Sequence, residues 1–591
     1  MCGIAGIVNY RESDQYLMSR ASIMRDKLRH RGPDEQNIVT IPNVAIAHTR
    51  LALLDLVGGK QPFSAPDRRY TITYNGEVYN FSALRKDLGN HWVFTTNSDT
   101  EVILAAYVHW GISCLSRFNG MFSFFIWDSV KQEGFAARDL LGVKPFVYQY
   151  QSGEFIFASE SKAILAAKAS TPIANKNAIL EYLVCPYFSG VEEPMFEGLT
   201  NLQPGHYLKI KRNGLTSHQW GDYELSSELT ADKSTTEELS ELLKSSIQST
   251  MISDVPVGAY LSGGFDSTLI TSIASKNAIK EFSTFTVQFT DQDKYGYNDS
   301  LIITSDDTPY AINAAKEIGV KNRLVKVDRA SLNETIKTLA CVNDALPAWE
   351  QEIAQYHLAQ TSSQHYKAVL VGDAADETHY GYQFLLDEHA TKSPSGIIQR
   401  FSMPPLKPGL ISNPLHYFDQ KYKTMTTQAG HSWQTPLDRY LATTYLIVKR
   451  WLPRLLHNGD IHSMYHSLEA RVPFADTNLI KLAQKVHPTS GYNNGIEKFL
   501  LRQSAKGLLP ENIRVRSKSA LPKDQGTEHL YKNIARELFT TSREFLDHFL
   551  DMESMFRLCD PEVSINEQER ALLFRTISLC HWSNAYGVNI R

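Results

Sequence analysis

The spacing of apolar runs differs between the two halves of this 591-residue chain. Residues 1–165 hold many short runs of β-branched and aromatic residues between turn signals, with two helical patterns among them. After a polar stretch, strand-like runs alternate with helical segments. Many strands with few helices indicate packed sheets with a helical layer, whereas regular alternation indicates a parallel sheet with crossover helices. The sequence therefore predicts two α/β domains, at 1–210 and 236–591, joined by a linker at 211–235.

Composition excludes several classes of protein. The formal net charge is −4, from 60 Lys and Arg against 64 Asp and Glu, whereas nucleic-acid-binding domains normally show a strong basic excess. No apolar run reaches the roughly 20 residues that span a bilayer, and the opening MCGIAGIVNYRESD has no basic region typical of a signal peptide. The six cysteines include no CxxC pair, so neither a disulfide framework nor a zinc site is predicted. We expect a cytoplasmic protein without nucleic-acid or membrane partners.

A cysteine at position two can act as a nucleophile that carries its own base. Removal of Met1 would leave Cys2 with its own α-amine, whose pKa near 8 suits a general base beside a thiol nucleophile. The alternative is an inert cysteine of the core.

Three further motifs favour the chemical interpretation of Cys2. Arg50 closes a strand and offers a guanidinium that suits a substrate carboxylate. Asn75 and the backbone N–H of Gly76 follow another strand and could form an oxyanion hole, although Asn-Gly is also a common hairpin turn. Asp99 could hold a substrate ammonium, or it could only cap the helix that follows. Together these residues predict a hydrolytic site that binds an amino acid.

The second half carries a glycine loop between an apolar strand at 257–261 and a helix. In Ser262-Gly263-Gly264-Phe265-Asp266-Ser267 the glycines let the backbone approach a phosphate, and the helix N-terminus directs N–H groups at it. Asp266 would repel phosphate unless a divalent cation lay between them, so its presence implies Mg²⁺. An ordinary glycine turn with a capping aspartate is the alternative.

The same pattern of an apolar strand, a turn of small residues and acidic side chains occurs at 369–377. There Asp376 is placed to share a metal with Asp266. Farther along, Lys518 could stabilise negative charge that develops on an α-phosphate or a tetrahedral carbon. For an isolated lysine, a solvated surface position is the alternative.

The first 163 residues resemble the class II glutamine amidotransferases. The motifs that carry the resemblance are MCGIAGI, RGPD, HTRLALLD, YNGEVYN, SDTE, FNGMFSFFIWD, ARDLLGVKP and FASESKA. The resemblance implies an N-terminal-nucleophile hydrolase fold, with two antiparallel sheets between helical layers. It also implies that Cys2 is the nucleophile, that Arg50 binds the glutamine carboxylate, and that Asn75 with Gly76 forms the oxyanion hole. Glu77 and Asp99 would contact the substrate amine.

Residues 236–525 resemble the synthetase domain of the glutamine-hydrolysing asparagine synthetases, a pyrophosphate-loop ATPase fold. The resemblance implies that ATP activates a carboxylate as its acyl-adenylate, and that ammonia arriving through an internal tunnel displaces AMP. Asp266 and Asp376 would hold Mg²⁺, Asp373 would assist the attack of ammonia, and Lys518 would stabilise the adenylation transition state. The residues implied to bind ATP or pyrophosphate are Leu261, Ser262, Gly263, Gly264, Asp266, Ser267, Val287, Val371 and Gly372.

The chain departs from the family pattern near the acceptor acid. Val371 replaces a serine, Ala374 replaces a glycine, and Tyr380 replaces the first glycine of a Gly-Gly-Tyr, where we expect it to add bulk near the acceptor pocket. The usual Gly-Phe after the lysine is Ala520-Leu521. None of these changes touches the metal acids or the lysine.

Several acceptors therefore stay open. Aspartate, which would yield asparagine, is the first candidate. The same chemistry on a sugar uronate, a cell-wall amino acid or a natural-product acid is the alternative, followed by intramolecular amide closure and by a non-catalytic sensor. The oligomeric state is also open, with a homodimer as one candidate.

Overall fold

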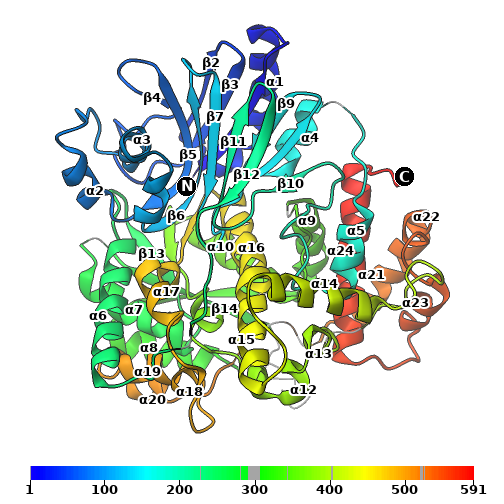
Figure 1. Cartoon of the computed structure of the whole chain (residues 1–591). Helices are drawn as coiled ribbons and strands as arrows, with labels where there is room; N and C mark the ends of the chain where they lie inside the picture. Colours follow the sequence, from blue (N-terminus) through cyan, green and yellow to red (C-terminus); the bar gives the residue numbers. More distant parts are fainter. Residues whose placement is uncertain are drawn as a thin grey trace.

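The computed structural model describes residues 2–591 except 169, 227, 280, 291–305, 343, 401–402, 520–523 and 525. Met1 and the departure at Ala520-Leu521 lie outside the described residues. The amino-terminal domain lies at the top of Figure 1, above a larger, mostly helical domain.

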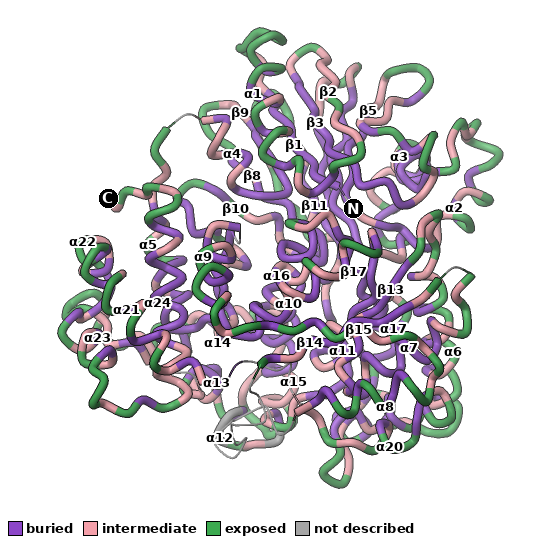
Figure 2. Tube along the Cα trace, turned by 180° about the vertical axis from the view of Figure 1, so that it is seen from behind, coloured by how far each residue is buried: buried purple, intermediate pink, exposed green. Residues whose placement is uncertain are grey.

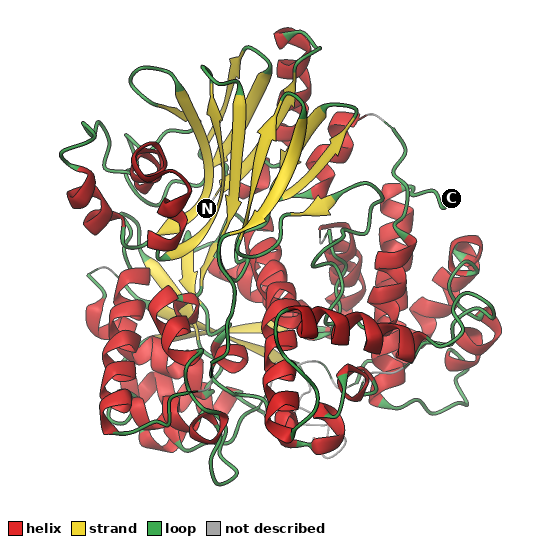
Figure 3. Ribbon diagram, in the orientation of Figure 1, coloured by secondary structure: helices red, strands yellow, loops and turns green. Residues whose placement is uncertain are grey.

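Two six-stranded antiparallel sheets form the amino-terminal domain (Figure 3). The first has the order β10-β8-β9-β1-β3-β2, with β1 Cys2–Asn9, β2 Glu35–Ile41, β3 Val44–Arg50, β8 Val147–Gln151, β9 Glu154–Ala158 and β10 Thr200–Asn201. The second has the order β12-β11-β7-β6-β5-β4, with β4 Phe63–Ser64, β5 Tyr70–Val78, β6 Gly120–Asp128, β7 Glu133–Arg138, β11 His206–Lys211 and β12 Gly214–Gln219.

Strand β1 is apolar along its whole length because both of its faces are covered. Ile4 and Val8 point between the sheets and join a core that includes Trp127 of the second sheet. Ala5 and Ile7 point the other way, into the core beneath helix α1 (Asp14–Lys27), as the two-residue period of a strand requires. Helices α1 and α4 (Ser161–Lys168) cover the first sheet, and α3 (Asp99–Trp110) packs on the second together with α2 (Phe81–Leu88). The predicted four-layer sandwich is confirmed.

Strand β12 lies within the stretch that the sequence assigns to the linker. It pairs with β11 at the edge of the second sheet, from Gly214 to Gln219. Most of its side chains are exposed, so it lacks the alternation of apolar and polar residues that would predict a strand. The irregular connection runs instead from residue 220 to helix α6 (Lys233–Thr250).

The second domain is built on a parallel sheet with the order β15-β14-β13-β16-β17. Its strands are β13 Val257–Tyr260, β14 Ser283–Phe289, β15 Lys321–Val327, β16 Ala368–Leu370 and β17 Glu469–Arg471. Helices α6, α7 (Phe265–Asn277) and α8 (Thr308–Ile318) form one group around it. Helices α9 (Leu332–Val342), α10 (Gln351–Ser362) and α16 (Leu452–Tyr465) form the other. The predicted parallel sheet with flanking helices is confirmed.

The order of these strands places the two predicted loops side by side. Strands β13 and β16 are neighbours and run parallel, so the loops that follow Tyr260 and Leu370 leave the same edge of the sheet. Ligands of open parallel sheets bind at this carboxyl edge.

The last helix, α24 (Glu567–Tyr586), is part of the core, although its sequence carries no motif that we can name. It packs against α9, α21 (Glu528–Thr541) and α5 (Lys176–Val184), and it is largely buried in Figure 2. No helix in the described ranges is long and apolar enough to cross a membrane.

Candidate active sites

The first site is centred on Cys2, at the start of the central strand β1. The residue is 7% exposed, and its backbone nitrogen lies 3.1 Å from Oδ1 of Asn75 on β5. Burial raises the pKa of the Cys2 thiol. A buried thiol of this kind needs a base beside it to become a nucleophile, and an amine on the Cys2 nitrogen would be the nearest one.

Asn75 and Gly76 have the properties of oxyanion donors. Asn75 is fully buried, and within the described part of the chain its Nδ2 atom has no hydrogen-bond partner. Such an unmatched buried donor is costly unless a ligand completes it. Gly76 has φ +154°, and a Cβ atom there would lie 2.1 Å from the carbonyl oxygen of Met121. Only glycine therefore lets β5 pass this close to β6.

Arg50 and Asp99 come from different elements, β3 and α3. Arg50 pairs with Cys2 in the register of β1 and β3. Its Nη atoms donate to Glu35 and to the carbonyl oxygens of residues 54, 55 and 56, so a substrate carboxylate would have to replace some of these bonds. Oδ2 of Asp99 accepts from Tyr74 Oη at 2.8 Å and Val78 N at 3.1 Å, and burial raises its pKa. Ser98 caps the helix, so Asp99 is not used for capping.

Glu77 connects the first site to the second domain. Its Oε1 atom lies 3.3 Å from Nη2 of Arg471, whose Nε atom donates to Glu469 at 2.5 Å. Burial, followed by the charge of Glu469, raises the pKa of Glu77 to about 8. The sequence contains Glu469 and Arg471 in LEARVPF, but it gives no sign that strand β17 ends against Glu77.

The second site begins with the loop between β13 and α7. Ser262 Oγ lies 3.0 Å from Ser267 Oγ and accepts from the backbone N–H of Gly264 at 3.2 Å. Gly263 has φ +75°, and a Cβ atom there would lie 2.4 Å from the backbone nitrogen of Ala311. Arg516 Nη1 donates to the carbonyl oxygen of Gly263 at 2.9 Å. The backbone angle of Gly263 therefore shapes the loop, and the Arg516 guanidinium binds its main chain.

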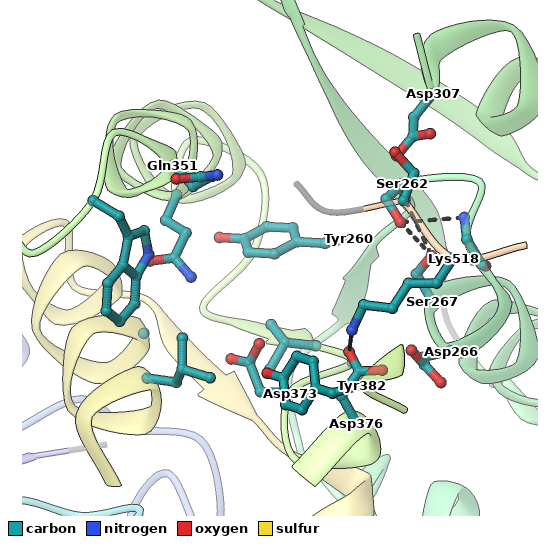
Figure 4. A pocket seen from close by; sticks show the side chains of 18 of the residues that line it. Tyr260, Ser262, Asp266, Ser267, Asp307, Gln351, Asp373, Asp376, Tyr382 and Lys518 are labelled. Atoms are coloured by element: carbon teal, nitrogen blue, oxygen red, sulfur yellow. Dashed lines mark hydrogen bonds and ion pairs between the residues drawn. The ribbon is translucent and has the colours of Figure 1, made fainter. Parts of the chain in front are cut away.

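Two lysines bind the two predicted metal acids, and Figure 4 shows one of them, Lys518, against Asp376. Lys498 Nζ lies 2.5 Å from Asp266 and 2.6 Å from Asp376, and Lys518 also forms an ion pair with Asp376. Burial opposes ionisation of Asp376, but Lys498 and Lys518 lower its pKa to about 2. The sequence predicts Lys518 but misses Lys498, which precedes α19 (Phe499–Ser504) with φ 53°.

Asp373 lies beside this acid–lysine cluster without an ion pair in the described part of the chain. Burial, and then the charges of Asp376 and Asp266, raise its pKa to about 6. A carboxylate with a pKa near 6 is well suited to accept a proton at neutral pH.

Tyr380 does not lie where we expected it. Its side chain is buried, its hydroxyl donates to the Val486 carbonyl oxygen at 2.8 Å, and its ring stacks on Tyr440. A Cβ atom on Gly491 would collide with this ring at 1.9 Å, so the absent side chain of Gly491 makes room for it. The expectation that Tyr380 adds bulk to the acceptor pocket is wrong, and Tyr382 lines the pocket instead.

One cavity of about 720 Å³ contains the second site. Among the predicted residues, the following line it: Leu261, Ser262, Gly264, Asp266, Ser267, Val287, Val371, Gly372, Asp373, Asp376 and Lys518. Gly263 is the one predicted loop residue that does not line the cavity. A further group of lining residues was not predicted, comprising Tyr187, Trp349, Tyr382, Phe384, Trp451 and Arg575.

A buried arginine connects the two sites. Arg31 Nε donates to the Cys2 carbonyl oxygen at 3.1 Å, and its Nη2 donates to Asp460 on α16 at 2.7 Å. The neighbouring Gly459 faces the second site, because a Cβ atom there would lie 3.3 Å from Asp373 Oδ2. Helix α16 therefore lies between the two sites, with Asp460 bound to Arg31 on the side of Cys2 and Gly459 facing Asp373 on the other.

Comparison with known proteins agrees with this division. A family model described as glutamine amidotransferase domain matches residues 1–221, and one described as asparagine synthase matches residues 238–583. The fold and the two sites define a glutamine-dependent carbon–nitrogen ligase with separate glutaminase and synthetase domains. The chain belongs to the glutamine-hydrolysing asparagine synthetase family.

Three relatives show the breadth of this family. Asparagine synthetase [glutamine-hydrolyzing] 3 of Bacillus subtilis is 30% identical, over 95% of this chain and 94% of its own. Asparagine synthetase [glutamine-hydrolyzing] 1 of the same organism is 29% identical, over 93% and 92%. Amidase chry2 of Gibberella zeae is 25% identical, over 98% of both chains.

Proposed function

We propose that the protein hydrolyses glutamine at Cys2 and uses the ammonia to convert a carboxylic acid to its amide, with ATP cleaved to AMP and pyrophosphate. The observation that supports this best is the pairing of a buried Cys2–Asn75 contact with a phosphate-loop cavity on the other side of α16.

In the proposed first reaction, the Cys2 sulfur attacks the glutamine amide carbon. Asn75 Nδ2 and the Gly76 N–H stabilise the oxyanion, and the Cys2 amine, freed by removal of Met1, takes the thiol proton as the sulfur attacks and gives it to the departing ammonia. Water then hydrolyses the thioester to glutamate. Arg50 would bind the substrate carboxylate, while Glu77 and Asp99 would bind its ammonium group.

In the proposed second reaction, an oxygen of the acceptor acid attacks the α-phosphorus of ATP, and pyrophosphate leaves toward Ser262 and Ser267. Lys518 offsets the charge that builds up in this step. Ammonia then attacks the acyl carbon, Asp373 takes up a proton, and AMP leaves. Val287, Leu261, Val371 and Gly372 would enclose the nucleotide.

Asp266 and Asp376 fit a magnesium ion brought by the nucleotide. Asp266 Oδ1 is buried without a hydrogen-bond partner among the described residues, and it lies on the same cavity as Asp376. Mg²⁺ usually takes one or two carboxylates together with phosphate oxygens. When bound, the ion would neutralise charge on the phosphates.

Product stoichiometry tests this function. With glutamine, ATP, magnesium and a set of carboxylic acids that includes aspartate, we expect amide, AMP and pyrophosphate in equal amounts, and AMP and pyrophosphate only when a suitable acid is present. Formation of ADP and phosphate, or pyrophosphate release that needs no acid, would contradict the proposal.

Aspartate is the first acceptor to test, because the family name and the first two relatives point to it. Its amidation stays a prediction. The amidase name of the fungal relative supports testing other acids beside it.

A further inference from the structure

The cavity extends beyond the phosphate loop and the acid–lysine cluster along a series of aromatic rings. Lys518 Nζ lies 4.3 Å from the centre of the Tyr382 ring, and Tyr382 lies 5.5 Å from Trp451 between ring centres. Trp451 in turn lies 4.4 Å from Tyr187, which stacks on Trp349 at 4.8 Å. All four rings line the cavity, so a path of aromatic surface leads away from the adenylation lysine.

These rings come from parts of the chain that are far apart. Tyr187 follows helix α5 of the amino-terminal half, whereas Trp349 precedes α10. Trp451 belongs to a single π-helical turn, Ile447–Trp451, directly before α16. Such turns occur frequently at functional sites. The fold therefore brings aromatic side chains from three distant segments to the same end of the cavity.

Arg575 of α24 also lines this cavity. It is 2% exposed, and within the described residues it has no ion pair and no hydrogen-bond partner for Nε or Nη2. Glu350, an acid that also lines the cavity, lies 3.6 Å from Arg570, and its negative charge also favours the charged form of Arg575 without forming an ion pair with it. Because no carboxylate among the described residues forms an ion pair with the buried Arg575 guanidinium, a ligand anion would be a favourable partner.

Arg575 lies at the Tyr187 end of the ring series. Helix α24, which carries Arg575, packs against α5, which Tyr187 follows, and the Arg575 carbonyl oxygen accepts from Tyr182 Oη of α5 at 3.2 Å. The cation is thus separated from Lys518 by Tyr382 and Trp451.

Aspartate would leave this end of the cavity unused. It has four carbons and charged groups at both ends, so it offers no apolar surface to the rings. An acid with an aromatic or aliphatic body would instead bury apolar area, at roughly 25 cal/mol for each Å².

We propose that the acceptor is an acid larger than aspartate, with an apolar body that lies along Tyr382, Trp451 and Tyr187 and a second anionic group that binds Arg575. This inference rests on the proposed function and specifies its substrate class. The carboxylate at the other end lies between Lys518 and Asp373, where it is adenylated.

ATP–pyrophosphate exchange tests the inference without any need for glutamine or ammonia. The probes are p-carboxyhydrocinnamate, which has a carboxylate at each end of an aromatic body, hydrocinnamate, which lacks the second carboxylate, and L-aspartate. We expect kcat/KM for the first probe to exceed that for aspartate by about tenfold or more.

Two variants show which contacts are responsible. Arg575→Gln should lower the ratio of exchange with p-carboxyhydrocinnamate to exchange with hydrocinnamate by about tenfold, whereas the exposed control Arg536→Gln should leave it unchanged. Tyr187→Leu should lower exchange with both aromatic acids by roughly fivefold and leave KM for ATP within about twofold.

The outcomes separate this inference from the proposed function. Exchange with aspartate alone, or a ratio that Arg575→Gln does not change, would overturn the inference and leave the proposed function standing. No exchange with any of the three acids, from protein that binds ATP, would overturn the inference. If the acid set in the stoichiometry experiment also failed to give AMP, the proposed function would fall with it.

Discussion

The glutaminase site and the synthetase cavity are assembled in different ways. The first draws its predicted residues from a single domain: Cys2 and Arg50 lie at the ends of the paired strands β1 and β3, Asn75 lies within β5 of the other sheet, and Asp99 starts α3. The second gathers residues from Tyr187 to Arg575 around the edge of a parallel sheet. The nitrogen donor is therefore fixed by short local motifs, whereas the acceptor depends on how distant helices pack.

The largest expected effect comes from separating the two regions. Cys2→Ala removes the proposed nucleophilic sulfur, so we expect glutamine-dependent amide formation to fall by more than about a thousandfold. Activity with added ammonium chloride should stay within about twofold of the wild type, because the synthetase cavity is untouched. Loss of both activities would show that the two regions do not work separately.

Lys518→Met tests the opposite region. The lysine binds Asp376 at the mouth of the phosphate loop, so we expect pyrophosphate exchange to fall by about 10²–10³-fold. Glutamine hydrolysis in the absence of an acid should change by less than about twofold, since no described contact joins Lys518 to the first site. Lys506→Met, at an exposed position, is the matched control.

Asp373→Asn divides the synthetase reaction into its two steps. Adenylation should survive, because the loop and Lys518 remain, whereas ammonium-dependent product should fall by about a hundredfold without the proton acceptor. Quenched-flow measurement of AMP and amide would show this. Equal losses in exchange and in amide formation would place Asp373 in the adenylation step instead.

Gly76→Ala tests how tightly the first site is built. The new Cβ atom would meet the Met121 carbonyl oxygen at 2.1 Å, so we expect the domain to lose about 1–3 kcal/mol of stability. Gly214→Ala, at a position with nothing within 4 Å, is the control in the same sheet and should change stability by less than about 0.5 kcal/mol. Thermal inactivation of glutamine hydrolysis measures both.

The smallest effect concerns pH. The pKa of Asp373 is raised to about 6 in the folded protein, above its value of 3.8 in the unfolded chain, so the folded state holds the proton more tightly. This contribution is fully present below pH 3.8 and is lost as the pH rises to about 6. Since Asp373 lines an open cavity, we expect only about 1–2 kcal/mol.

Chemical denaturation of the wild type and of Asp373→Asn at pH 5 and pH 7 measures this difference. The wild type should lose stability relative to the variant between the two values. A constant difference would contradict the raised pKa.

The sequence predicts more of the first site than of the second. The four-layer sandwich and the parallel sheet follow from the strand patterns, and single motifs of the first site, such as Asn75-Gly76-Glu77, hold their key residues at adjacent positions. Strand β12 could not be predicted because its exposed face has no apolar alternation. Lys498 precedes a short helix with an unusual backbone angle, which no residue pattern signals.

The aromatic end of the cavity is beyond prediction for a different reason. Arg575 lies within an ordinary helical pattern, and only the packing of α24 against α5 and α9 brings it to the cavity. The error over Tyr380 has the same origin, since the space that accepts its ring is created by Gly491, more than a hundred residues away.

In the proposed reaction the first site feeds ammonia to the second within one molecule. Glutamine labelled with heavy nitrogen in its amide, mixed with a large excess of unlabelled ammonium, tests it by mass spectrometry of the amide product. We expect the product to carry mostly heavy nitrogen, because ammonia passes directly from Cys2 to the neighbourhood of Asp373. A product whose label matches the diluted free ammonium would contradict it.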